Sequence, residues 1–264
     1  MNALALAAAA VFIAIVYAEP APAFSENEAL AVLVAAYPDA LLKHEGRALH
    51  WRDGTITDIS EGDERKTFEQ TLRGASLLDQ MRIRYPLGPI ETPPALNDDP
   101  GRFRNLAFFR KMYGNCWRGE VTGKLVPVVW LPKTWNYTFR ATAVNGVAQK
   151  LTEISQEIEL LPEKIRRAAY PTSGVYACRG IVDTSQPSMH SYGAAIDMNI
   201  AFADYWYWQR SANGAITYRN RMPNELVEIF ERHGFIWGGK WYHHDTMHFE
   251  YRPELIEFAR TRAH

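Results

Sequence analysis

Two short stretches of the sequence combine imidazole and carboxylate side chains in a way that could bind a metal ion. The first contains His190 and Asp197, and the second contains Asp245 and His248. Two imidazole nitrogens and one carboxylate oxygen are the protein ligands of many catalytic zinc sites, which leave a fourth position for water. The remaining carboxylate could then move protons. These residue types predict a zinc site that activates water.

The spacing of the first pair predicts where the two side chains lie. His190 and Asp197 are seven residues apart, so one unbroken strand would point them to opposite faces of a sheet. Gly193 stands between them and can adopt the positive φ that redirects the chain. We therefore expect His190 in a loop and Asp197 on a strand over residues 194–200. A carboxylate in so apolar a strand is costly to bury unless it is paired or binds a metal.

The second cluster leaves alternatives open. Asp245 and His248 are three residues apart, so they share a side only if the chain turns between them. His244 could replace His248 as a ligand, because an i, i+4 pair of histidines is a metal-binding spacing on a helix. Glu250 could replace Asp245 as the base, although on a strand it shares a side with His248 and would rather hold that imidazole. If they are not ligands, His243 and His244 are expected at the rim of the site.

Two further polar residues near the first cluster are candidates for the site. Arg179 precedes His190 by eleven residues and could bind a substrate carboxylate or stabilise an oxyanion; the alternative is a surface salt bridge. Ser188 is expected to cap the His190 loop or to bond the Asp197 carboxylate. It lacks the GxSxG setting of a nucleophilic serine.

Composition limits the class of protein. The chain has 264 residues, 47% of them hydrophobic and 22% charged, which is enough for one large domain or a domain with an extension. The net charge is −1 and no long run of one sign occurs, so nothing indicates binding to nucleic acid or to an acidic membrane surface. Most of the eight tryptophans and thirteen tyrosines should be core. Trp237 and Trp241 could instead wall a cleft.

The first eighteen residues are almost uncharged and apolar, and they predict a signal peptide or a membrane anchor. Val16, Tyr17 and Ala18 fit the small-residue rule for cleavage, but no Lys or Arg precedes the apolar run, so an uncleaved anchor is the alternative. Either route places the domain outside the cytoplasm. Cys116 and Cys178 could form a disulfide there, or remain two buried thiols.

Helical and extended segments alternate along the chain. Ser25 and Glu28 fit a capping box at the start of the first helix, and Asn145-Gly146 is typical of a two-residue hairpin turn. We expect helices over residues 26–37, 66–81, 103–113, 151–169 (in two pieces around Pro162) and 224–233. We expect strands over residues 125–131, 137–144, 173–179 and 194–200. Helices first and then strands around a metal loop favour an α+β fold with an antiparallel sheet.

The motifs around the two clusters resemble those of a known family. They read Ser188-x-His190-x-x-Gly193-x-Ala195-x-Asp197, then Trp237-Gly238-Gly239-x-Trp241, then Asp245-x-x-His248-Phe249-Glu250. This pattern is similar to the D-alanyl-D-alanine carboxypeptidase family of zinc peptidases. That family includes L-alanyl-D-glutamate endolysin-type peptidases and vancomycin-resistance dipeptidases, and it shares its fold with the hedgehog signalling domain. The resemblance covers roughly residues 173–251.

The resemblance implies roles for individual residues. It makes His190, Asp197 and His248 the ligands of Zn²⁺ and favours His248 over His244. It makes Asp245 the general base that takes a proton from water and passes it to the leaving amine. Family members also carry an arginine that binds substrate, and Arg179 is the residue expected to do so here.

The resemblance also implies a fold and a function. It implies a small antiparallel sheet that carries a zinc cleft and is flanked by helices. We expect a signal peptide or anchor (1–18), a mainly helical N-terminal extension (19–114) and a zinc peptidase domain (115–264), acting as a monomer. The expected substrate is a peptidoglycan stem peptide, cut beside a D-amino acid by a carboxypeptidase or an endopeptidase, with residues 202–208 shaping the cleft. A zinc-containing binding or signalling module without turnover is the alternative, which the presence of Asp245 disfavours. In a third alternative, the aspartates are only turn residues and the protein binds no metal.

Overall fold

A computed structural model describes residues 25–59, 66–181, 184, 186–211 and 213–261. The expected signal peptide or anchor at residues 1–18 lies outside the described residues. Within the described part, no helix combines the length and the apolar character needed to cross a bilayer.

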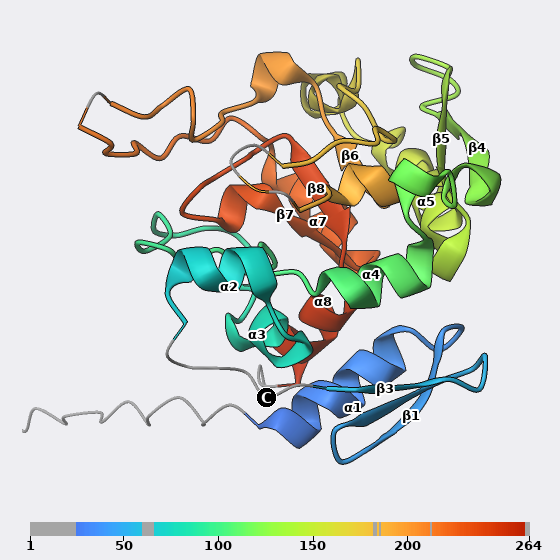
Figure 1. Cartoon of the computed structure of the whole chain (residues 1–264). Helices are drawn as coiled ribbons and strands as arrows, with labels where there is room; N and C mark the ends of the chain where they lie inside the picture. Colours follow the sequence, from blue (N-terminus) through green and yellow to red (C-terminus); the bar gives the residue numbers. More distant parts are fainter. Residues whose placement is uncertain (1–24, 60–65, 182–183, 185, 212, 262–264) are drawn as a thin grey trace, which may run out of the picture.

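The described residues form a mixed α+β structure with small antiparallel sheets, as expected (Figure 1). One sheet contains β1 (Leu41–Glu45), β2 (Ala48–Trp51) and β3 (Ile56–Asp58); a hairpin contains β4 (Leu125–Trp130) and β5 (Tyr137–Thr142); and a third sheet contains β6 (Ala195–Asp197), β7 (Phe235–Trp237) and β8 (His248–Tyr251). The helices are α1 (Glu26–Ala36), α2 (Phe68–Gly74), α3 (Leu77–Arg82), α4 (Leu106–Tyr113), α5 (Val147–Ile158), α6 (Glu163–Arg166), α7 (Asn224–Arg232) and α8 (Pro253–Arg260).

The third sheet has β8 in its centre, between β6 and β7. Its register places Asp197 of β6 opposite His248 of β8, and Trp237 of β7 opposite Phe249 of β8. All four residues of β8 are buried. A strand that is buried on both faces and still carries His248 and Glu250 must supply partners for both side chains, because an unpaired buried charge is costly.

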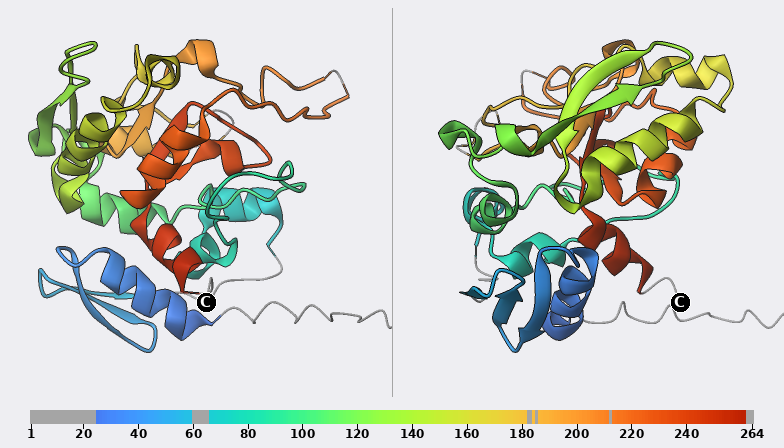
Figure 2. Two further views of the ribbon diagram at one scale, coloured as in Figure 1. Left: turned by 180° about the vertical axis from the view of Figure 1, so that it is seen from behind. Right: turned by 90° about the vertical axis from the view of Figure 1, so that its right-hand side faces the viewer.

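Helices and the β4–β5 hairpin surround this sheet. α7 packs against β7, and α5 packs against the β4–β5 hairpin (Figure 2). Phe230 of α7 stacks on Phe249 of β8 with ring centroids 4.1 Å apart. The same hydrophobic core also takes in Leu30 of α1 and Phe109 of α4. The N-terminal segment thus contributes to one continuous core with the later elements, and the boundary expected at residue 114 stays a prediction.

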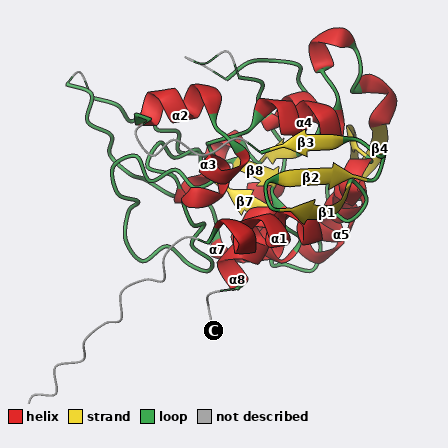
Figure 3. Ribbon diagram, turned by 60° about the horizontal axis from the view of Figure 1, so that its bottom comes forward, coloured by secondary structure: helices red, strands yellow, loops and turns green. Residues whose placement is uncertain are grey.

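The N-terminal segment is less helical than expected. Strands β1 to β3 lie side by side (Figure 3), next to α1 at one end of the molecule (Figure 1). Gly46, with φ of +56°, allows the tight turn between β1 and β2. Alternation of partly buried and buried residues in β2 allows Leu49 and Trp51 to join the core.

Helix starts and stops follow their capping residues. Ser25 accepts a hydrogen bond from the Glu28 amide at the start of α1. The helix expected over residues 66–81 is divided into α2 and α3, because Ser76 and Asp79 form a second capping box inside that range. Gly114, with φ of +99°, ends α4 at the expected place.

Two predictions of local structure were wrong. Asn145 and Gly146 do not form a hairpin turn after β5; both adopt positive φ and lead into α5 instead. Residues 173–179 do not form a strand. Only Gly174 makes a bridge, to Asp197, so the segment is extended without a continuous ladder.

Candidate metal centre and catalytic pocket

His190 is positioned by a short 3₁₀-helix, η5 (Met189–Tyr192). Ser188 caps it, since its Oγ accepts a hydrogen bond from the His190 amide at 3.3 Å; this is one of the two roles expected for Ser188. Gly193 then ends the helix with φ of +67°. A Cβ at this position would lie 2.6 Å from Leu125 Cδ2 and 3.0 Å from the Thr142 amide nitrogen, so only glycine fits the turn that redirects the chain into β6.

The three expected metal ligands converge. Asp197 Oδ1 lies 3.1 Å from His190 Nε2 and 2.9 Å from His248 Nδ1, and the two nitrogens lie 3.2 Å apart. A tetrahedral zinc ion with ligands at its usual distances needs those ligand atoms about 3.3 to 3.5 Å apart. The observed separations are slightly shorter, so a small expansion would admit the ion. Among the described residues, no other group of three His, Cys, Asp or Glu side chains is arranged so that it could hold a metal ion.

Both imidazoles are held in the tautomer that a metal ligand requires. His190 Nδ1 lies 2.7 Å from the carbonyl oxygen of Val175, to which it donates, and this leaves Nε2 unprotonated for a metal. His248 Nε2 lies 2.9 Å from Glu250 Oε2, to which it donates, so Nδ1, which faces Asp197, is the nitrogen that a metal ion would bind in place of a proton. Glu250 therefore lies on the same side of β8 as His248, as the sequence predicted, and holds the imidazole.

The charges around these ligands favour a cation. Burial alone would raise the pKa of Asp197, but the adjacent His190 and His248 hold that pKa far below its ordinary value. Burial alone would lower the pKa of His248, but hydrogen bonds to Asp197 and Glu250 raise it to about 10. An arrangement that attracts a proton so strongly also suits a divalent cation.

Asp245 has the properties of a proton-transfer group. The His248 amide donates to the Asp245 carbonyl oxygen at 3.1 Å, so the chain turns between them as their three-residue spacing required. Asp245 Oδ1 is buried and has no hydrogen-bond partner in the described part of the chain. Burial, followed by the charge of Asp197, raises the pKa of Asp245 to about 6. A carboxyl group with a free oxygen and a pKa near neutrality can both accept and return a proton.

A pocket opens beside Asp245 and His248. Its remaining walls carry arginines and aromatic rings: Arg102, Arg104, Arg179, Tyr205, Trp206, Trp241 and His243. Tyr205 and Trp206 come from the aromatic segment that the sequence analysis expected to shape the cleft. The pocket thus combines positive charge with flat apolar walls next to the metal ligands.

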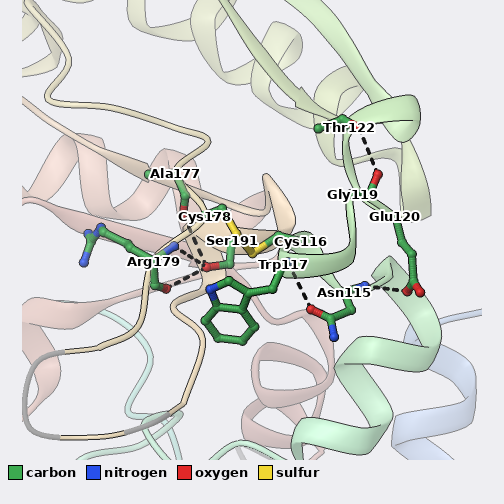
Figure 4. Close-up of a disulfide and its surroundings, with 10 residues drawn as sticks. All are labelled: Asn115, Cys116, Trp117, Gly119, Glu120, Thr122, Ala177, Cys178, Arg179 and Ser191. Carbon is green, nitrogen blue, oxygen red and sulfur yellow. Dashed lines mark hydrogen bonds between the residues drawn. A yellow bond between two sulfur atoms is a disulfide. The ribbon is translucent and has the colours of Figure 1, made fainter.

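Arg179 lines this pocket, and its main chain is anchored on the opposite side (Figure 4). Cys178 forms a disulfide with Cys116 of η1 (Cys116–Arg118), with Cα atoms 5.7 Å apart. Ser191 Oγ accepts from the Arg179 amide at 3.1 Å and donates to the Arg179 carbonyl oxygen at 2.7 Å. In the part of the chain that is described, no carboxylate forms a salt bridge with the Arg179 guanidinium. The side chain is therefore available for an anionic ligand.

The two tryptophans occupy different places. Trp241 lines the pocket, and its indole nitrogen donates to the carbonyl oxygen of Pro100 at 2.7 Å. Trp237 does not line the pocket, contrary to the substrate-binding role expected for it. It is buried in the core, where its indole nitrogen donates to the Thr246 carbonyl oxygen at 2.8 Å. Gly239 lies against this ring, and a Cβ there would approach the ring to 2.1 Å, which explains the glycine after Trp237-Gly238.

The neighbouring histidines also differ. His243 lines the pocket, with Nδ1 2.6 Å from Asp99 Oδ2, while its amide donates to Asp99 Oδ1 at 2.9 Å. His244 is buried against the Tyr218 ring and does not join the group of metal ligands. Asp99 and Arg104 also contact residues of the site, although no motif in the sequence indicated them. Neither lies in a local motif, because each meets its partner across more than 140 residues of chain.

Comparison with known proteins agrees with this geometry. Residues 182–251 match the model of a family described as D-alanyl-D-alanine carboxypeptidase. That segment contains His190, Asp197, Asp245 and His248. No curated protein and no solved structure matches the chain. The match covers about a quarter of the chain, so this segment is similar to that peptidase family, and it carries all four residues of the predicted site.

Proposed function

We propose that this protein is a zinc-dependent peptidase that acts outside the cytoplasm on peptidoglycan stem peptides and cuts beside a D-amino acid. The observation that carries the proposal is the convergence of His190, Asp197 and His248 beside the unpartnered carboxylate of Asp245. The family match supports the peptidase class. The disulfide supports an oxidising compartment, where such bonds persist.

The residues present fit a zinc ion. His190 Nε2, Asp197 Oδ1 and His248 Nδ1 would hold it, and the ion would supply Lewis-acid activation of water and of the scissile carbonyl. Asp245 would accept a proton from the attacking water and return it to the leaving amine. Because the carboxyl is buried and lies close to the charge of Asp197, it keeps the raised pKa that this exchange of protons needs.

The cations of the pocket support an anionic peptide as the substrate. Arg102 bonds Asp99 and Arg104 bonds Glu250, so both are neutralised by partners within the protein. Arg179 is left to bind a substrate carboxylate or the oxyanion that forms during attack. Stem peptides carry several carboxylates, and Tyr205, Trp206 and Trp241 would pack against their apolar atoms.

Digestion of purified peptidoglycan tests the proposal. The full chain, loaded with zinc, should release peptides whose masses identify the bond that is cut, and a chelator should abolish the release. Asp245→Asn, which keeps the size of the side chain, should release at least about a hundredfold less while still binding zinc. Zinc binding without any released peptide would favour the non-catalytic binding module, and absence of zinc binding would reject the metal site itself.

A further inference from the structure

We propose that Arg104 is a positioning residue for the metal ligand His248 and acts on it through Glu250. The proposal rests on the proposed zinc site and extends it to a part of the chain that the family match does not cover. Arg104 Nη2 donates to Glu250 Oε2 at 2.5 Å, and its Nε donates to Oε1 at 3.3 Å. The same Oε2 accepts from His248 Nε2 at 2.9 Å.

Glu250 is held from several directions at once. Besides His248 and the two donors of Arg104, Arg252 Nη1 donates to Glu250 Oε1 at 3.1 Å. A carboxylate has about four acceptor sites, so these four hydrogen bonds occupy all of them. Glu250 and Arg252 are fully buried and Arg104 is 8% exposed, so water cannot replace a lost donor easily. The plane of the carboxylate, and with it the orientation of the imidazole, is fixed by its arginine partners.

The network continues into the N-terminal segment. Arg252 Nε donates to Glu254 Oε1 at 2.6 Å, and Tyr37, the residue after α1, donates its hydroxyl to Glu254 Oε2 at 2.6 Å. Arg252 also donates to the Gly101 carbonyl oxygen at 2.7 Å. A chain of buried hydrogen bonds therefore connects α1 and residues 101–104 to His248. This assigns the N-terminal segment a direct part in building the metal centre.

The guanidinium of Arg104 is matched to this role. Its planar fork donates to both oxygens of Glu250, whereas a lysine ammonium would supply one point charge. Without Arg104, Glu250 keeps Arg252 and His248 as partners but loses the two donors on the pocket side, so it can rotate and let the imidazole tilt. Loss of a group that supports a metal ligand typically weakens metal binding about 10- to 100-fold.

Competition with a chromophoric chelator measures zinc affinity without reference to catalysis. We expect Arg104→Met to bind zinc about 10- to 100-fold more weakly than the wild type and Arg104→Lys to show an intermediate loss. Lys240→Met is the matched control, because Lys240 is also a buried cation in an ion pair, with Glu231, but does not contact Glu250. It should lose stability without losing zinc affinity.

The outcomes separate this proposal from the proposed function. If the wild type binds no zinc, the metal site itself is rejected. If the wild type binds zinc and Arg104→Met binds it equally tightly, or if Lys240→Met weakens binding as much as Arg104→Met, the positioning role is rejected. If Arg104→Met does not fold, Arg104→Lys decides: affinity equal to that of the wild type overturns the proposal, and weaker binding supports it.

Discussion

Asp197 and His248 face each other across the β6–β8 ladder, with Asp197 Oδ1 2.9 Å from His248 Nδ1. The sheet register therefore aligns two of the three expected ligands before any metal binds. His190 then completes the group from the 3₁₀-helix that Gly193 ends. β-strand pairing holds Asp197 and His248 in place. Replacement of His190 should therefore remove one expected ligand without moving the other two.

We predict that His190→Ala reduces zinc content to background while the fold is retained. The β6–β8 pairing does not depend on His190, whereas two remaining ligands hold zinc poorly. Metal analysis after dialysis and a far-ultraviolet circular dichroism spectrum would check both parts. Stoichiometric zinc in this variant would show that His190 is not a ligand.

We predict that Asp245→Asn keeps the zinc affinity of the wild type and lowers kcat by at least about a hundredfold. Asp245 is not one of the three converging ligands, so its replacement should leave them in place. Steady-state kinetics and chelator competition on the same preparation give the two numbers. Near-normal kcat would show that another group of the pocket acts as the base.

We predict that Arg179→Met lowers kcat/KM about tenfold or more for substrates whose carboxylate is free, since a hydrogen bond to a charged group contributes about 1.5 to 3 kcal/mol. The loss should be much smaller for the same substrate with that carboxylate amidated. Arg140 donates to the main-chain carbonyl oxygens of Thr122 and Leu125 and does not line the pocket, so Arg140→Met offers a control variant. Equal losses on both substrates would argue against carboxylate binding by Arg179.

We predict that removal of the disulfide, by Cys116→Ser with Cys178→Ser, lowers the free energy of unfolding by about 2 to 4 kcal/mol. The bond closes a loop whose ends are 62 residues apart in sequence, and it anchors the segment that carries Arg179. Urea denaturation of the wild type, with and without reductant, provides the comparison. Unchanged stability would show that the native contacts around η1 hold this segment without the covalent bond.

We predict that Asp79 makes the stability of the fold depend on pH in the acid range. Burial alone would raise the pKa of Asp79, but the Ser76 amide and Lys66 bond its carboxylate and hold that pKa below its ordinary value. The folded protein thus binds this proton more weakly than the unfolded chain, so the carboxylate contributes stability above the unfolded pKa of about 3.9. That contribution is lost as the pH falls through the lower folded pKa.

Urea denaturation of the wild type and of Asp79→Asn between pH 7 and pH 2 measures this dependence. The variant should be less stable at neutral pH, and the difference should narrow below about pH 4. A difference that stays constant over the whole range would contradict the depressed pKa of Asp79.

The sequence predicted the site better than it predicted the surroundings of the site. His190, Gly193 and Asp197 lie within one short motif, and the turn from Asp245 to His248 is local, so residue types and spacing were sufficient. Arg104 and Asp99 meet their partners only after the whole chain has folded, and no local pattern records such contacts.

Two wrong predictions of local structure have the same origin. Asn145 and Gly146 both tolerate positive φ, which suits a hairpin turn and also the start of α5, and only tertiary packing decides between them. Residues 173–179 have the composition of a strand, but only Gly174 forms a β-bridge, to Asp197 of β6. Trp237 was placed in the cleft because aromatic residues often line clefts, yet its indole is buried beside Gly239.

The buried ion pairs between the two halves of the chain limit how this protein can be shortened. Recombinant expression of residues 182–251 alone, the span that a family comparison would suggest, would remove both Arg104 and Arg252 from Glu250. The Glu250 carboxylate would then face the interior of a fragment without its arginine partners. Truncated versions made for crystallography, or fusions that borrow the peptidase as a module, should therefore retain the chain from α1 onward.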